Sequence, residues 1–148
     1  MMRVLVAYDG TMQTKDALRY GAQKVKENGG VLVALHVFNS NIFIDYDVFG
    51  AEDAGQAEAM RFAEDAKQII GETGKDIRAR LVVAEGDPEE ETINYARENH
   101  MDLLLCPPRY KSIIRSFRKL KDEQGRKVCE DTIFDETEKP MLSVLSQR

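Results

Sequence analysis

The chain has 148 residues, 43% of them hydrophobic and 32% charged, with a formal net charge of −5 and a pI of about 5.1. This composition is typical of a globular protein with one core and argues against a general nucleic-acid-binding role. No apolar run approaches the roughly 18 residues that a membrane span requires. Because an apolar segment containing Arg3 starts almost at Met1, we expect no signal peptide and a cytoplasmic location, in which Cys106 and Cys129 are reduced thiols.

Buried strands and amphipathic helices are predicted to alternate along the whole chain. Apolar runs without polar alternation indicate strands that are buried on both faces, as in parallel sheets. Apolar residues at helical spacing indicate helices with one buried face. The predicted strands cover residues 3–8, 31–38, 79–84, 102–106 and 140–145. The predicted helices cover residues 14–28, 57–70, a segment starting at 88, and 112–136 in two pieces separated near Gly125.

Two helix starts carry capping signals. Thr14 is the candidate N-cap of the first helix, whereas Asp87, Pro88 and Glu90 fit the N-cap, N1 and N3 positions of the third. With right-handed crossovers, this order of elements predicts a doubly wound three-layer α/β/α fold for a single domain over residues 1–148.

Asp9 follows the first predicted strand directly and is followed by Gly10. Ligands of open α/β sheets bind beyond the carboxyl ends of the strands, where the strand order reverses, and Asp9 is expected at that edge. Its carboxylate either contacts a ligand, such as an adenine or a ribose, or caps the turn into the first helix.

Several segments together resemble the universal stress protein family, in the order in which that family has them. They are Val4–Thr11 for the first strand and turn, Leu35–Val37 for the end of the second strand, Gly86–Pro88 for the third helix start, Asp102–Leu105 for the fourth strand and Lys139–Val144 for the closing strand. The resemblance implies a Rossmann-like, five-stranded parallel sheet of order 3-2-1-4-5. It also implies a homodimer paired through the last strand, here Met141, Leu142, Ser143, Val144 and Leu145.

Some members of that family bind ATP, and the resemblance implies where. The end of strand one and its aspartate (Ala7 and Asp9) would contact the adenine, with Val37 nearby. The family's phosphate site is a Gly-x-x-Gly pattern after strand four, followed by Gly-Ser or Gly-Thr. This chain has Pro107 and Tyr110 at the first two glycine positions, and Gly125, Arg126 and Lys127 near the last.

The missing glycines matter because such loops hold phosphate through backbone N–H groups at close approach. Proline has no N–H, and tyrosine places a large side chain where the phosphate would approach. We therefore expect weak or no ATP binding through this loop, and no cofactor.

A basic segment follows the fourth strand and continues to residue 127. It is interleaved with apolar residues at helical spacing, which predicts an amphipathic helix with a cationic face. That face would hold a phosphate in place of the lost backbone donors, meet an acidic partner or RNA, or be a solvated surface offset by Asp122 and Glu123. The basic residues are Arg109, Lys111, Arg115, Arg118, Lys119, Lys121, Arg126 and Lys127.

The remaining features leave alternatives open. The apolar connection 39–52 is a lid, a partner surface or a cover over the core edge. Cys106 is a reactive thiol beside Arg109 or, more simply, a small buried residue, and Cys129 is expected on the apolar face of a helix. His36 and His100 have no neighbouring residues spaced as zinc ligands.

These observations favour a cytoplasmic, homodimeric binding or regulatory protein of universal stress type, with an unidentified protein partner, no enzymatic activity and no membrane or nucleic-acid partner. The alternative is a protein that binds ATP or AMP with Asp9 and the basic segment. An enzyme of the wider adenine-nucleotide α-hydrolase-like group is a third hypothesis, for which no catalytic constellation is found. The candidate nucleotide-binding residues are Ala7, Asp9, Val37, Cys106, Arg109, Lys111, Arg126 and Lys127.

Overall fold

The computed structural model describes residues 1–38, 51–74 and 76–147, and within 51–60 it describes the backbone alone. Most of the apolar connection 39–52 therefore lies outside the described residues. The elements, in chain order, are β1 (Met2–Ala7), α1 (Met12–Asn28), β2 (Gly30–Phe38), α2 (Ala51–Thr73), β3 (Ala79–Glu85), α3 (Pro88–Glu98), β4 (Leu103–Cys106), α4 (Lys111–Glu123), β5 (Val128–Phe134) and β6 (Pro140–Gln147).

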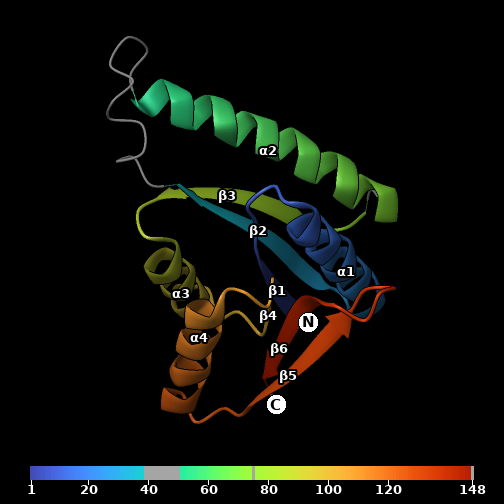
Figure 1. Ribbon diagram of the computed structural model, residues 1–148, viewed down its shortest axis with the longest axis vertical. Helices are drawn as coiled ribbons and strands as arrows, with labels where there is room; N and C mark the ends of the chain where they lie inside the picture. The colour runs from blue at the N-terminus through green and yellow to red at the C-terminus, as the bar shows by residue number, and fades with distance from the viewer. Residues whose placement is uncertain (39–50, 75, 148) are drawn as a thin grey trace.

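The strands form one mixed sheet of order β3-β2-β1-β4-β6-β5. β1 pairs in parallel with β2 and β4, and β2 in parallel with β3, so that Leu5 lies opposite both Val33 and Leu104. Helices α1 and α2 cover one face of the sheet, and α3 and α4 cover the other (Figure 1). The predicted three-layer, Rossmann-like α/β/α architecture is present.

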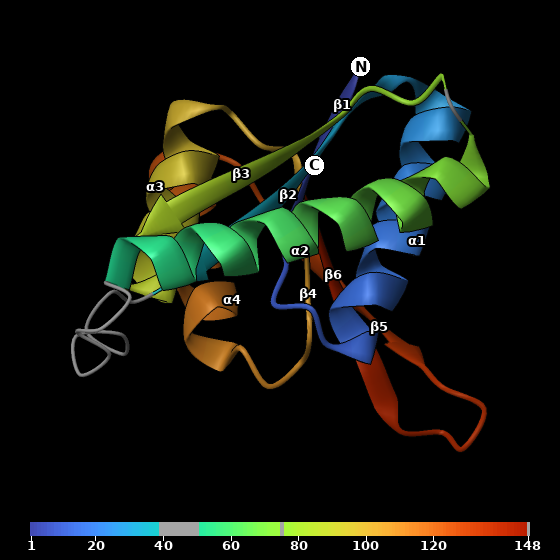
Figure 2. The same cartoon turned by 90° about the horizontal axis from the view of Figure 1, so that it is seen from above.

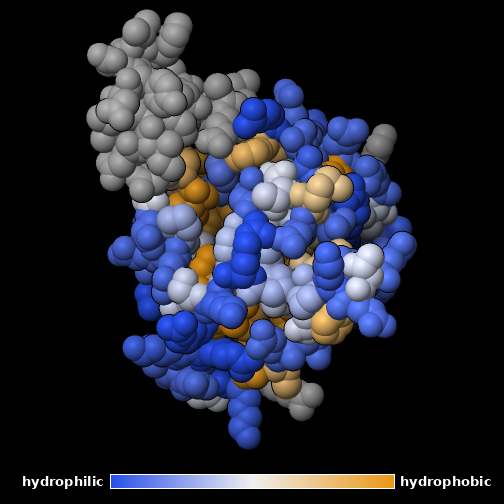
Figure 3. All heavy atoms as spheres, viewed as in Figure 1, coloured by the Kyte–Doolittle hydropathy of each residue, from blue (hydrophilic) through white to orange (hydrophobic). Residues whose placement is uncertain are grey.

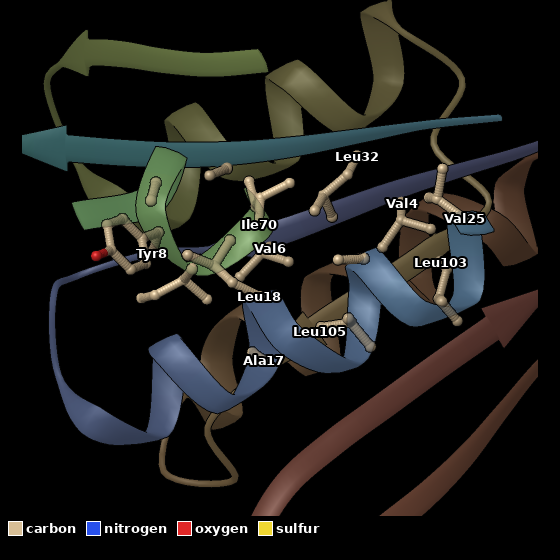
Figure 4. Packing of buried hydrophobic residues seen from close by; sticks show 14 of the residues in the cluster. Val4, Val6, Tyr8, Ala17, Leu18, Val25, Leu32, Ile70, Leu103 and Leu105 are labelled. Atoms are coloured by element: carbon tan, nitrogen blue, oxygen red, sulfur yellow. The ribbon is translucent and has the colours of Figure 1, made fainter. Parts of the chain in front are cut away.

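Successive residues of the central strand supply two separate cores. Val4 and Val6 pack under α1 and α2, whereas Leu5 packs under α3 and α4, because side chains alternate between the faces of a strand. Figure 4 shows the first of these clusters, with Leu18 of α1 and Ile70 of α2 against β1 and β2. The outer surface seen in Figure 3 is mainly hydrophilic, broken by small apolar patches.

Capping residues fix where two helices begin. Asp87 caps α3 as predicted, since its carboxylate accepts the Glu90 N–H at 2.9 Å. The cap of α1 is Thr11 and not Thr14, because the Thr11 hydroxyl accepts the Thr14 N–H. Gly30 then starts β2 with φ of 121°, and a Cβ atom there would lie 1.8 Å from the Met2 carbonyl oxygen. Only glycine permits β1 and β2 to approach at this point.

The C-terminal part of the sheet differs from the prediction. Residues 128–134, predicted to be helical, form strand β5, and β6 runs antiparallel to both β4 and β5. The five-stranded parallel sheet of order 3-2-1-4-5 is therefore wrong for this chain. Cys129, expected on a helix, lies in β5 and is partly buried.

The connections explain this arrangement. Gly125, with φ of 73°, follows α4, and the β-branched residues beyond it favour a strand. Helix α4 is long enough for the crossover to a strand parallel to β4, whereas residues 135–139 are too few for a second crossover. The chain therefore returns as a hairpin, and β6 fills the gap between β4 and β5. The turn of the hairpin projects beyond the helices (Figure 2).

This topology changes the expectation for a dimer. Leu142, Ser143, Val144 and Leu145 are buried inside the chain, and both edges of β6 are hydrogen-bonded to neighbouring strands. A second copy that pairs with residues 141–145 would have to displace β5. A homodimer remains a prediction, and its interface has to use a surface other than the edge of β6.

Candidate functional site

A cavity of about 370 Å³ opens at the carboxyl ends of β1, β2 and β4. From β1 the strand order runs in opposite directions, with β2 and β3 on one side and β4 on the other. The cavity lies at the carboxyl end of β1, which is therefore the switch point of the sheet. A larger groove, of about 790 Å³, lies between α2 and β3, but its walls are mainly small apolar side chains. The cavity at the strand ends is the better candidate site, because it lies at the switch point where open α/β sheets bind ligands. That cavity is lined by Ala7, Tyr8, Asp9, Leu35, Val37, Asp87, Pro88, Glu89, Thr92, Arg109, Tyr110, Ser112 and Ile113.

Asp9 organises the turn on one side of this cavity. Its Oδ1 atom accepts hydrogen bonds from the Thr11 N–H at 3.0 Å, the Thr11 hydroxyl at 2.6 Å and the Thr14 hydroxyl at 2.9 Å. Gly10, with φ of 81°, makes the turn from β1 into these residues. The turn-capping interpretation of Asp9 is therefore confirmed.

The other carboxylate oxygen of Asp9 holds the loop that follows β4. Its Oδ2 atom accepts a hydrogen bond from Arg109 at 3.0 Å and a second one from the Tyr110 hydroxyl. The Arg109 guanidinium also donates to Gln13 of α1 and lies 4.8 Å from the centre of the Tyr110 ring. The loop of residues 107–110 thereby closes over Asp9.

Protonation states in the cavity follow from burial and these hydrogen bonds. Burial alone would raise the pKa of Asp9, but hydrogen bonds from Thr11, Tyr110 and Thr14 outweigh it and hold that pKa below its usual value. Burial, together with the hydrogen bond to Asp9 and its charge, raises the pKa of Tyr110 to about 12. At neutral pH, Asp9 is therefore a carboxylate and Tyr110 a neutral donor.

Tyr8 adds a buried hydroxyl at the same edge of the sheet. Its side chain is 2% exposed, and its hydroxyl has no hydrogen-bond partner within the described ranges. Burial and the charges of Asp65 and Asp9 raise the pKa of Tyr8 to about 12. Figure 4 shows this side chain at the end of the apolar cluster nearest the carboxyl end of β2.

The charge balance of the cavity is unfavourable for a polyphosphate. The carboxylates of Asp9, Asp87 and Glu89 line it, against the single guanidinium of Arg109, which is already paired with Asp9. In the loop itself, prolines 107 and 108 carry no N–H, and the Tyr110 N–H donates to the Pro107 carbonyl at 3.1 Å.

One feature does favour an anion. Helix α4 has no side-chain hydrogen bond at its N-cap, and its first turn contains no acidic residue. Ser112 and Ile113 of that turn line the cavity. The free N–H groups of a helix start attract negative charge, so one anionic group fits here better than a chain of phosphates does.

The structure divides the eight predicted nucleotide-site residues. Ala7, Asp9, Val37 and Arg109 line the cavity together. Cys106 lies beneath it, fully buried at the end of β4, and burial together with the charge of Glu130 raises the pKa of its thiol to about 12. The thiolate needed for a reactive cysteine is therefore suppressed.

The other three residues lie elsewhere. Lys111 lines a groove between α4 and β5, whereas Arg126 and Lys127 follow the C-terminal end of α4. The basic segment is therefore not one phosphate site. Three residues that line the cavity were not predicted from the sequence as site residues: Asp87, Glu89 and Tyr110. The first two follow β3 at the same sheet edge as Asp9, which is the signal that could have found them.

Two kinds of feature are absent from the described ranges. None of the helices there combines the length and apolar character needed to cross a membrane. Across the same ranges, no three His, Cys, Asp or Glu side chains are grouped as metal ligands would be.

The chain folds as an open α/β sheet with a cavity at its switch point, which is where proteins of this architecture bind ligands. The sequence profile of the universal stress protein family matches residues 1–118. The chain therefore belongs to the universal stress protein family. The match ends inside α4, so the β5–β6 hairpin lies beyond it.

Individual relatives agree with this assignment. The universal stress protein YxiE of Bacillus subtilis is 25% identical over 118 residues, which cover 72% of this chain and 78% of YxiE. The solved structure of UspA from Lactobacillus plantarum superimposes with a TM-score of 0.60 at 20% identity, covering 71% of this chain and 75% of that one. A universal stress protein from Archaeoglobus fulgidus, solved in complex with dAMP, has a TM-score of 0.58 at 21% identity, covering 79% and 89%.

Proposed function

We propose that this chain is a non-enzymatic binding and regulatory protein of universal stress type that binds ATP weakly or not at all. The observation that carries the proposal is that the Asp9 carboxylate is already fully hydrogen-bonded within the chain. Its carboxylate is saturated by hydrogen bonds from the chain itself, two of them from the loop that stands where a glycine cradle would be. An adenine or ribose that needs this carboxylate has to displace Arg109 and Tyr110.

The chemistry of the cavity supports a binding role over catalysis. The lowered pKa makes Asp9 a weak general base at neutral pH. The raised pKa values of Tyr110 and Cys106, each about 12, leave both groups protonated and unreactive. An ATPase would also need groups that neutralise phosphate charge, whereas this cavity is lined by three carboxylates.

A second candidate function is the binding of a small nucleotide such as AMP. The uncapped start of α4 beside the cavity favours a single phosphate, and a volume of about 370 Å³ lies in the range of ligand pockets. The Archaeoglobus fulgidus relative solved with dAMP is consistent with a ligand of this class. On this hypothesis the loop 107–110 opens, and Asp9 contacts the nucleoside.

Calorimetry on stripped protein separates these functions. The protein is first denatured to look for released nucleotide, and ATP and AMP are then titrated into refolded, nucleotide-free protein. We expect no saturable heat with ATP, and tight ATP binding would overturn the proposal. Saturable AMP binding that is lost in Asp9→Asn and kept in the control Asp16→Asn would establish the second function. The fold of each variant is checked by circular dichroism.

We also propose that the protein forms a homodimer, as the resemblance implies. Because β6 is enclosed by β4 and β5, the interface has to lie elsewhere. Sedimentation velocity at micromolar concentration tests this directly, and a clean monomer would contradict it.

A further inference from the structure

A second concave surface lies on the other side of α4 from Asp9. Helix α4 and strand β5 diverge from the turn that joins them, as Figure 1 shows, and a groove of about 520 Å³ lies between them. One wall is a face of α4, and the other is the side of β5 that carries Glu130, Thr132 and Phe134. This groove shares no lining residue with the cavity at Asp9.

The helix wall of the groove is cationic. Lys111, Arg115 and Arg118 are spaced three or four residues apart, so they share one face of α4. Arg118 pairs with Glu130 at 2.6 Å across the narrow end of the groove. Lys111 and Arg115 form no ion pair or hydrogen bond with any described residue.

Two like charges at positions i and i+4 repel each other and destabilise a helix. In a chain with a net charge of −5, an acidic neighbour for Lys111 and Arg115 would be an ordinary arrangement, yet none is present among the described side chains. Their positive charge is therefore available to a partner with carboxylates.

The strand wall supplies an apolar contact and an open edge. Phe134 is 56% exposed, which is unusual for a phenylalanine, and it lines the wide end of the groove beside Pro140. β5 is the last strand of the sheet, so its outer edge has no strand partner in the described part of the chain. Such an edge accepts an extended peptide through its backbone groups.

We propose that the groove between α4 and β5 binds an extended acidic peptide segment of a partner protein. The peptide lies along β5, its carboxylates face Lys111 and Arg115, and an apolar side chain covers Phe134. Peptide is favoured over nucleic acid because the cations of the groove all lie on the α4 wall, and the carboxylate of Glu130 faces them from the β5 wall. A peptide can space its carboxylates to avoid Glu130, whereas a phosphate backbone carries charge at every residue.

This proposal is independent of nucleotide binding at Asp9. Arg109 pairs with Asp9, whereas Lys111, two residues later, lines the groove. A negative result in the ATP or AMP experiments therefore does not bear on peptide binding in the groove. A negative result with the peptide likewise does not bear on nucleotide binding at Asp9.

The test is fluorescence anisotropy with a labelled synthetic peptide that alternates glutamate with threonine and carries one leucine. A matched peptide with glutamine in place of glutamate is the ligand control. We expect saturable binding of the acidic peptide alone, weakened by added salt. In the variant Lys111→Gln/Arg115→Gln we expect at least a tenfold loss of affinity, and Phe134→Ser should weaken binding at least threefold.

A charge-matched protein control is available at the far side of the sheet. Arg78→Glu just before β3 lowers the net charge by two, as Lys111→Gln/Arg115→Gln does, and should leave binding unchanged. Equal loss in this control, equal binding of the glutamine peptide, or no saturable binding to the wild-type chain would overturn the proposal. Saturable binding of a short oligouridine that the double variant abolishes would also overturn it, in favour of a nucleic-acid groove. Thermal unfolding of each variant confirms that it is folded.

Discussion

Replacing Asp9 with asparagine tests how strongly this carboxylate organises the edge of the sheet. Asparagine keeps one oxygen for Thr11 and Thr14 but places an NH₂ group against Arg109 and Tyr110, where the carboxylate accepted two hydrogen bonds. The substitution therefore removes the charge and both contacts to the loop 107–110, while the turn into α1 keeps its acceptor.

The magnitude follows from the exposure of each contact. The Arg109 pair is half exposed, with 46% of the arginine and 29% of the aspartate side chain accessible, so screening limits it to about 0.5 kcal/mol. The partly buried hydrogen bond from Tyr110 to the carboxylate contributes about 1.5 kcal/mol. The hydrogen bonds from Thr11 and Thr14 weaken because their acceptor loses its charge, and each adds a loss of a few tenths of a kcal/mol. We expect Asp9→Asn to lower the free energy of unfolding by about 2 to 3 kcal/mol.

The assay is urea unfolding at pH 7 with fluorescence or circular dichroism as the signal. Asp16→Asn is the matched control, because Asp16 forms a similarly half-exposed pair with Arg19 on α1, and the substitution should cost no more than about 0.5 kcal/mol. Tyr110→Phe completes a double-mutant cycle, in which we expect a coupling energy with Asp9 of about 1 kcal/mol. A loss below 0.5 kcal/mol in Asp9→Asn would refute the reasoning.

The pH dependence provides an independent check. The pKa of Asp9 is lower in the folded than in the unfolded chain, so its stabilisation is fully present above about pH 4 and is lost as the pH falls through the lowered pKa. The difference in unfolding free energy between wild type and Asp9→Asn should therefore shrink below about pH 4. A difference that stays constant on acidification would contradict the assigned pKa direction.

Two further predictions concern the core. Phe117 of α4 is 0% exposed in the cluster under α3 and α4, so Phe117→Ala should lower the free energy of unfolding by about 3 to 5 kcal/mol in the same urea assay, whereas a loss near 1 kcal/mol would contradict its burial. Cys106 is fully buried and Cys129 partly exposed, so a thiol reagent should modify one equivalent in the native protein and a second only after unfolding, and Cys129→Ser should remove the native reaction.

The first part of the fold could be predicted because its signals are local. The apolar runs of β1 and β2 exclude solvent on both faces, and Asp87 and Pro88 mark the start of α3 without any tertiary information. The segment after α4 lacked such a signal. Glu130 and Asp131 interrupt its apolar alternation, and the pairing that makes it a strand comes from β6. The antiparallel direction of β6 is set by the β5–β6 hairpin and by the open edge of β4 that β6 fills. No local sequence pattern encodes either of these.

The site was predictable to the same extent. Asp9 and Ala7 could be placed because they end a strand, and the rule for open α/β sheets locates strand ends. The separation of Arg109 from Lys111 could not be foreseen, because it depends on where α4 begins. With the helix starting at Lys111, the two cations fall on opposite sides of it. The hydrogen bond from Tyr110 to Asp9 joins residues 101 positions apart, and no local pattern specifies it.

The enclosed position of β6 has a consequence for how the protein is made. Synthesis proceeds from the N-terminus, so β1 to β4 leave the ribosome before β5 and β6. At that stage β4 can pair with β1 along one edge, but its other edge has no strand partner. The exposed edge of β4 and the underside of α4 remain without their packing until residues 140–147 emerge. Until then, the half-built sheet presents an apolar strand to other nascent chains. This interval is when the protein would depend most on chaperones, whatever its stability once the hairpin has closed.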